Sequence, residues 1–288
     1  MFLNEATKLR AQTIIKGLEK RNMHGVFCAT KEDALKQALS YIKEGSSVSW
    51  GGSMSVSEIG LMDALKEGNY HLIDRSVAKN FDEQREIFSK AVLSDYFLMS
   101  SNAITLDGEL INIDGTGNRV ACLSYGPKHV IMIVGMNKVV NDVEDGIKRV
   151  RNFASPPNTL RLGLKTPCSM TGRCGDCYGD TCICSQIVVT RRQSAMMKDR
   201  VKVAETMKQK NIITYAAHLN GTDYTKEDYQ KGTAFFIGNE GNGLTDKLTD
   251  KAQKKIKIPM CGKVESLNAA MASGLLVYEA RRQRQGVD

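Results

Sequence analysis

The sequence lacks the kinds of segment that would place the chain in or across a membrane. Over its 288 residues, no run approaches the ~20 consecutive apolar residues of a transmembrane helix. The opening residues, MFLNEATKLRAQ, contain no apolar core of a secretion signal. Internal repeats and low-complexity segments are absent as well. We therefore expect a globular cytoplasmic protein with no membrane partner, built as one large or two modest domains of roughly 100–200 residues each.

Basic residues are in excess, and the excess is greatest toward the C-terminus. The net charge is +8, and residues 193–288 carry 16 basic and 11 acidic residues. This balance is compatible with a polyanionic partner and equally with a solvated lysine-rich face. Charge alone does not decide between the two.

Five of the eight cysteines crowd into one short segment, with spacing C-x5-C-x2-C-x4-C-x-C. Such density in a cytosolic chain argues against structural disulfides. Thiolates two residues apart can share a zinc ion or an iron–sulfur cluster, although the spacing fits neither a zinc finger nor a ferredoxin well. Reduced thiols that pack a loop, and a redox disulfide, remain open alternatives. The candidate metal ligands are Cys168, Cys174, Cys177, Cys182 and Cys184.

Strand-like and helix-like segments alternate along the chain, which predicts an α/β fold. KHVIMIVG at 128–135 is a continuous apolar run, as expected of a central parallel strand covered on both faces. Asp107-Gly108 predicts the turn of a β-hairpin over 104–114.

The composition changes after the strand at 185–192, where a lysine-rich helix over 194–210 is predicted. We interpret this change as the joint between two domains, 1–192 and 193–288.

Two polar segments of the first domain are candidate ligand sites. One is a glycine turn between a strand and a helix, where backbone can approach a ligand closely and helix N–H groups can face an anion. The other is SSNAITLDGELINIDGTGNRVA at 100–121, where amides, carboxylates and an arginine gather on loops. Tight-turn chemistry is the alternative for both. The candidate residues are Gly51, Gly52, Ser53, Asn102, Glu109, Asp114, Asn118 and Arg119.

The order WGGSMS, SSNAIT, DGEL, NIDGTGNRVA, HVIMIVG, SPPN and TPCSMTGRCGDC resembles the LUD (lactate-utilisation) domain over residues 1–192. The resemblance implies a fold like the sugar-phosphate isomerase and CoA-transferase (NagB/RpiA-like) group. It also implies a role in lactate or related organic-acid metabolism, with a small organic acid or related metabolite as ligand. It supplies no catalytic residue.

Two long motifs lie in the second domain, FFIGNEGNGLT and IKIPMCGKVESLNAAMASG. They resemble the second and third motifs of the SpoU (TrmH-type) RNA 2′-O-ribose methyltransferases, which have a knotted α/β (SPOUT) fold. The resemblance implies binding of S-adenosyl-L-methionine and RNA, and a homodimer. It implies cofactor-binding roles for Gly238, Asn239, Gly241, Gly243, Ile258, Met260 and Leu267. It implies catalytic roles, in placing the methyl group and the ribose, for Glu240, Ser266 and Asn268.

The first half of this second family's domain is missing. Its first motif, of the form Asn-x-Gly-x-x-x-Arg, is not found between residues 193 and 232. We therefore expect impaired methyl transfer. The alternatives are an organic-acid protein with a passive C-terminal remnant and an accessory protein that binds a metal or cluster. The joint itself is a genuine fusion, a degenerate remnant or a join of two genes.

Overall fold

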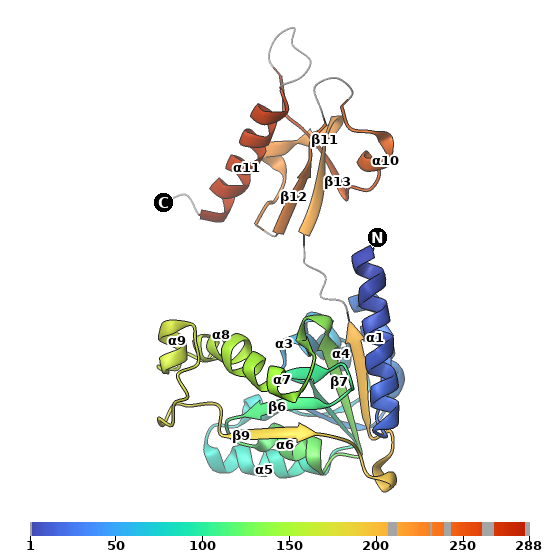
Figure 1. The fold of residues 1–288 in the computed structure, drawn as a ribbon, viewed down its shortest axis with the longest axis vertical. Coiled ribbons are helices and arrows are strands. Elements are labelled where there is room, and N and C mark those ends of the chain that lie inside the picture. The colour runs from blue at the N-terminus through green and yellow to red at the C-terminus, as the bar shows by residue number, and fades with distance from the viewer. Residues whose placement is uncertain (1, 207–211, 231, 239–242, 261–267, 286–288) are drawn as a thin grey trace. The chain divides into compact units, whose positions relative to one another are not determined.

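The computed structural model describes residues 2–206, 212–230, 232–238, 243–260 and 268–285. The chain forms two compact units, Met1–Lys208 and Gln209–Asp288. Figure 1 shows their elements. The α/β class predicted from the sequence is confirmed, because the sheets are mainly parallel and helices alternate with strands. None of the helices in the described ranges is both long and apolar enough to cross a membrane.

The first unit is built on a six-stranded parallel sheet in the order β1-β10-β7-β4-β2-β3. Its strands are β1 (His24–Cys28), β10 (Val201–Thr206), β7 (His129–Gly135), β4 (Tyr96–Met99), β2 (Ser47–Trp50) and β3 (His71–Ile73). A smaller sheet has the order β8 (Val139–Val140), β5 (Ala103–Thr105), β6 (Leu110–Asp114) and β9 (Gln186–Thr190). The predicted hairpin is present, since β5 and β6 pair antiparallel.

Helices cover both faces of the large sheet. One face packs on α1 (Phe2–Lys20), α5 (Phe81–Val92) and α6 (Asn118–Ser124). The other packs on α2 (Lys31–Tyr41), α3 (Met54–Glu58) and α4 (Leu61–Glu67). Along β7 the side chains alternate between the two cores, so that Val130 and Met132 face one and Ile131 and Ile133 the other. The apolar run at 128–135 is therefore a central strand covered on both faces, as predicted.

The remaining helices of the first unit lie near the smaller sheet. They are α7 (Val143–Arg149), a π-helical turn (Val150–Ala154), α8 (Ser155–Arg161) and α9 (Pro167–Thr171). Ile111 and Ile113 of β6 pack with Val150 in a separate small core. This arrangement places α7 and α8 over one end of the parallel sheet, beside the hairpin (Figure 1).

The predicted helix over 194–210 is wrong in its main part, because residues 201–206 form β10 in the interior of the large sheet. Val201 and Val203 are buried, and the stem of Lys202 brings its ammonium 5.8 Å from the Tyr41 ring. The lysines of this segment thus led to a helix prediction where alternating buried valines form a strand. The first unit consequently extends to Lys208 rather than ending at 192. A boundary at 192 would remove a strand that pairs on both sides and leave two strands with unpaired backbone groups.

The second unit holds a three-stranded parallel sheet in the order β12 (Gly232–Phe236), β11 (Ile212–Asp223) and β13 (Lys254–Lys257). In the described part of this unit the sheet is accompanied by α10 (Asp246–Thr249), α11 (Ala269–Gln285) and a 3-10 turn (Tyr224–Lys226). Its core is aromatic: the rings of Tyr215 and Tyr229 meet edge to face at 5.0 Å between centroids, and Leu276 of α11 packs against them. The predicted knot depends on loops that lie outside the described residues.

Glu205 is an unusual member of the large sheet. It lies on β10 beside Phe27 of β1 and Val134 of β7, and it is fully buried. Neither of its carboxylate oxygens accepts a hydrogen bond from a described residue. Burial raises the pKa of Glu205 from 4.5 to about 8.

We predict that Glu205 makes the first unit less stable as pH rises between those two pKa values. The folded state keeps a proton there that the unfolded chain releases, so the free energy of unfolding falls by about 1.4 kcal/mol per pH unit. Glu205→Gln should remove this dependence, whereas Glu86→Gln, at an exposed position of α5, should not. Urea titrations followed by the fluorescence of Trp50 in β2, the single tryptophan, measure this. Equal pH dependence in wild type and Glu205→Gln would contradict the prediction.

Candidate functional site

A cavity of about 720 Å³ opens where the parallel strands β2, β4, β7 and β10 end. Trp50, Ser100, Gly135 and Thr206, at or just after these ends, all line it. The hairpin segment and helices α7 and α8 supply the other walls. The carboxyl edge of a parallel sheet is where α/β proteins commonly bind ligands, and the volume is typical of a ligand pocket.

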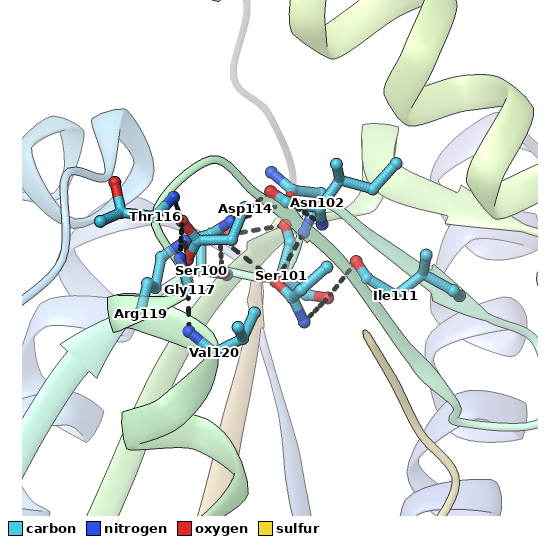
Figure 2. A network of polar contacts seen from close by, with 11 residues as sticks. Ser100, Ser101, Asn102, Ile111, Asp114, Thr116, Gly117, Arg119 and Val120 are labelled. Atoms are coloured by element: carbon cyan, nitrogen blue, oxygen red, sulfur yellow. Dashed lines mark hydrogen bonds and ion pairs between the residues drawn. The ribbon is translucent and has the colours of Figure 1, made fainter. Parts of the chain in front are cut away.

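Arg119 of α6 organises one wall of the cavity (Figure 2). Its guanidinium donates to backbone oxygens and side-chain amides of two neighbouring segments, and its Nε lies 3.5 Å from an Asp114 carboxylate oxygen. The other contacts are with Ile113 O at 2.7 Å, Asn102 Oδ1 at 3.1 Å, Asn112 Oδ1 at 3.2 Å and Ser100 O at 3.4 Å. Protein groups thus engage every edge of the fork, which makes Arg119 a scaffold rather than a free ligand-binding group.

Burial lowers the pKa of Arg119, and the nearby Arg75 adds to the decrease, whereas Asp114 opposes it. An arginine stays protonated under such shifts, so a positive charge is held within the wall. Asp114 in turn accepts from three backbone N–H groups at the start of α6, those of Thr116, Gly117 and Val120, each at 3.3 Å. The carboxylate therefore fixes the helix that carries Arg119.

The loop after β4 is tied to β6 by Asn102. Its Oδ1 accepts from Ile113 N at 2.9 Å as well as from Arg119. Arg149 of α7 donates to Asn102 O at 2.7 Å and to Asn137 O at 3.2 Å. Burial lowers the pKa of Arg149 too. Asn102 therefore links two cationic side chains from different helices, Arg119 through its side-chain oxygen and Arg149 through its backbone oxygen.

The glycine turn at 51–52 lies between two guanidinium groups. A Cβ at Gly51 would meet Arg119 Cδ at 3.1 Å, and one at Gly52 would meet Arg75 Nη2 at 3.0 Å. The glycines thus make room for arginines as well as for a ligand. Ser53 follows as the N-cap of α3, accepting from Val56 N at 3.4 Å.

Lys138 completes the cationic lining. Its ammonium donates to Ser100 Oγ at 2.7 Å and to Ser55 Oγ at 3.1 Å. Sequence reasoning missed Lys138, Arg75 and Arg149, because each stands alone in its own segment and only the fold brings them to the cavity.

Seven of the eight predicted ligand-site residues line this cavity: Gly51, Gly52, Ser53, Asn102, Asp114, Asn118 and Arg119. Glu109 does not. It lies at the turn end of the hairpin, where it forms an ion pair with Arg21 at 3.4 Å. Glu109 follows the Asp107-Gly108 turn, whereas Asn102 and Asp114 lie at the opposite ends of the two hairpin strands, where the cavity is.

The five clustered cysteines lie on and after α9, and their side chains have several different neighbours. Within the described ranges, no three Cys, His, Asp or Glu side chains are placed to share a metal ion. Cys168 instead lies 3.1 Å from Thr166 Oγ1, and Cys184 lies 3.3 Å from Ser155 Oγ. All five are free thiols. Cys177 interacts with Cys182, and Cys184 lies near Cys182. Binding of zinc or a cluster by these thiols stays a prediction.

Part of the predicted cofactor site of the second unit is described. A Cβ at Gly238 would overlap the backbone of Gly243 and lie 2.5 Å from Leu244 N, so the backbone at Gly238 lies close to that at 243–244. Ile258 packs on the aromatic core, and Met260 is half-buried. Asn268 Oδ1 accepts from Met271 N at 2.8 Å, at the start of α11. Asn239, Glu240, Gly241, Ser266 and Leu267 lie outside the described residues.

The first unit is thus an α/β domain with a cation-lined cavity at the carboxyl edge of its parallel sheet. A family model described as LUD domain matches residues 11–204, and the chain belongs to this family. A second model, the SpoU rRNA Methylase family, matches residues 189–278. The predicted order of the two segments is therefore confirmed.

Two curated relatives are tRNA methyltransferases. The tRNA (guanosine(18)-2′-O)-methyltransferase of Escherichia coli (strain K12) is 41% identical over 81 residues, which is 27% of this chain and 35% of that protein. The enzyme of the same name from Aquifex aeolicus (strain VF5) is 43% identical over 74 residues, 26% of this chain and 35% of its own. The chain thus spans about a third of the length of these relatives.

Two solved structures give weaker similarity. A DUF162 family protein from Deinococcus radiodurans has a TM-score of 0.41 at 10% identity, covering 69% of this chain and 98% of that one. The TrmH/SpoU tRNA modifying enzyme of A. aeolicus has a TM-score of 0.25 at 17% identity, covering 71% and 84%. At these scores neither structure contributes to the assignment of the site.

Proposed function

We propose that the first unit binds a small organic anion in the cavity at the carboxyl edge of its sheet. The observation that carries this proposal is the crowding of like charge: six basic residues line the cavity and only two acidic ones, Glu58 and Asp114. Asp114 is already engaged by Arg119 and by backbone N–H groups. A bound anion would offset the remaining positive charge.

Arg75 is the side chain best suited to contact the anion. It forms no ion pair or hydrogen bond with any described side chain, and its guanidinium lies against Gly52 beside the Arg119 guanidinium. A carboxylate there could accept two parallel hydrogen bonds from its fork. The LUD resemblance, which implies lactate or a related organic acid, supports a carboxylate as the ligand class.

We predict that Arg75→Gln weakens binding of organic anions by about 10–100-fold, the effect of losing a hydrogen bond to a charged group. Titration of the full chain with L-lactate and with citrate can be followed by the fluorescence of Trp50, which lines the cavity. Arg85→Gln, at an exposed position of α5, is the matched control and should bind as wild type does. Unchanged binding by Arg75→Gln, or no binding of either anion by wild type, would count against the proposal.

A second proposal concerns the second unit: it retains a binding site for S-adenosyl-L-methionine. Similarity to the two tRNA methyltransferases and to the SpoU family supports it. The close approach of Gly238 to the backbone of Gly243 supports it too, because glycines let backbone come near a flat nucleoside. The cofactor would supply a methyl group, and Ile258 and Met260 would contribute apolar lining.

Methyl transfer by this chain is expected to be impaired. Those relatives are named for 2′-O-methylation of tRNA, but the chain spans about a third of their length. The arginine-bearing first motif of the SpoU family is not found between residues 193 and 232. We therefore propose cofactor and RNA binding, with assembly as a homodimer, and impaired transfer by this chain.

Gly238→Ala should abolish the binding of S-adenosyl-L-methionine, because the added methyl group would overlap the Gly243 backbone. Gly274→Ala is the matched control: it lies on α11 with open space around the added carbon, and it should bind normally while stabilising the helix by up to ~1 kcal/mol. Calorimetric titration measures both. Normal binding by Gly238→Ala, or no heat with wild type, would refute the proposed site.

A further inference from the structure

A second depression on the first unit is separate from the cavity described above. Its volume is about 380 Å³, and it shares no lining residue with the larger cavity. Five of its eight lining residues are basic and one is acidic. The lining comprises Thr13, Lys16, Gly17, Lys20, Arg21, Asp107, Arg191 and Arg192.

Hydrogen bonds to backbone atoms hold three distant segments together at this depression. Gln193 N donates to Arg21 O at 2.9 Å, and Asn22 Nδ2 donates to Gln193 O at 2.9 Å. The Arg21 guanidinium also donates to Arg191 O at 2.8 Å and to Asp107 O at 2.8 Å. The end of α1, the hairpin turn and the segment after β9 are thereby fixed side by side.

The positive charge of this depression is not balanced by the fold. Arg21 is compensated by its ion pair with Glu109. The other four, Lys16, Lys20, Arg191 and Arg192, are exposed and form no ion pair with any described residue. The negative end of the α1 dipole accounts for lysines in its last turns, but the two arginines lie outside that helix.

We infer that this basic depression binds the phosphodiester backbone of RNA. Four uncompensated cations around a concave surface concentrate positive potential and attract a polyanion. No aromatic side chain is among the lining residues, so bases have nothing to stack on there. Contacts would be to phosphates, which makes binding independent of sequence and strongly dependent on salt. The inference rests on this cation cluster and stands apart from the proposed methyl-donor site.

The test uses the full chain and a fluorescently labelled, unmodified tRNA transcript, with anisotropy measured over a range of salt concentrations. Lys16→Gln combined with Arg192→Gln removes one cation from each of two segments. We expect about tenfold weaker binding at low salt, and a slope of log affinity against log salt that is smaller by about two. The matched control, Lys36→Gln with Lys43→Gln, removes the same charge from exposed positions on and after α2, which covers the other face of the sheet. It should stay within about threefold of wild type.

Equal weakening by both pairs would overturn the inference, since only net charge would then matter. Absence of RNA binding by wild type would overturn it as well. Titration of the same variants with S-adenosyl-L-methionine separates the two proposals: the Lys16/Arg192 pair should bind that cofactor as wild type does. A missing cofactor signal together with a preserved difference between the pairs would remove the cofactor site and leave the RNA surface in place.

Discussion

The geometry of the first unit depends on one buried guanidinium. Arg119 reaches from α6 to the loop after β4 and to β6, and it meets a backbone or side-chain acceptor on each edge of its fork. Removing such a group deprives several acceptors of a charged donor at once, which costs more than an exposed ion pair contributes, although Asp114 and Asn102 keep their bonds from backbone N–H groups. Arg119 therefore fixes the hairpin and the loop after β4 relative to each other, and its side chain packs against the glycine turn.

The contacts of Arg119 determine which cationic side chains of the cavity are available to contact a ligand. Because Arg119 is fully occupied by the protein, its charge contributes to the field of the cavity without contacting what binds there. Arg75 is near enough to lower the pKa of Arg119. Arg149 and Lys138 are fixed by oxygens of the same loop region. A cavity that confines like charges in this way favours an anion through its fixed electrostatics.

Local patterns in the sequence identified elements whose signal lies within one segment. The apolar run of β7, the Asp107-Gly108 turn and most of the polar 100–121 segment were of this kind. β10 was not predicted, because the lysines around it favoured a surface helix. The alternation of Val201, Lys202 and Val203 fits a strand only once β1 and β7 are known to pair on either side of it.

Features that depend on distant segments could not be found in that way. Arg75, Lys138 and Arg149 each follow a different element, and nothing in their own neighbourhoods marks them. Glu109 was misplaced because the sequence does not say which end of a hairpin faces a cavity. The cysteine spacing predicts shared ligation, which stays a prediction; in the structure Cys168 and Cys184 also contact hydroxyl groups of Thr166 and Ser155. Both family resemblances could be predicted from the sequence, because each depends on long contiguous motifs in a fixed order and not on contacts between distant segments.

The central claim is that Arg119 and Asn102 act as one unit that fixes the cavity wall. A double-mutant cycle tests it most directly, with Asn102→Ala, Arg119→Lys and the combined variant measured by urea unfolding of the full chain through Trp50 fluorescence. Lysine keeps the charge but cannot reproduce the planar fork. We expect a coupling free energy above ~1 kcal/mol. Effects that add to within about 0.3–0.5 kcal/mol would contradict the claim.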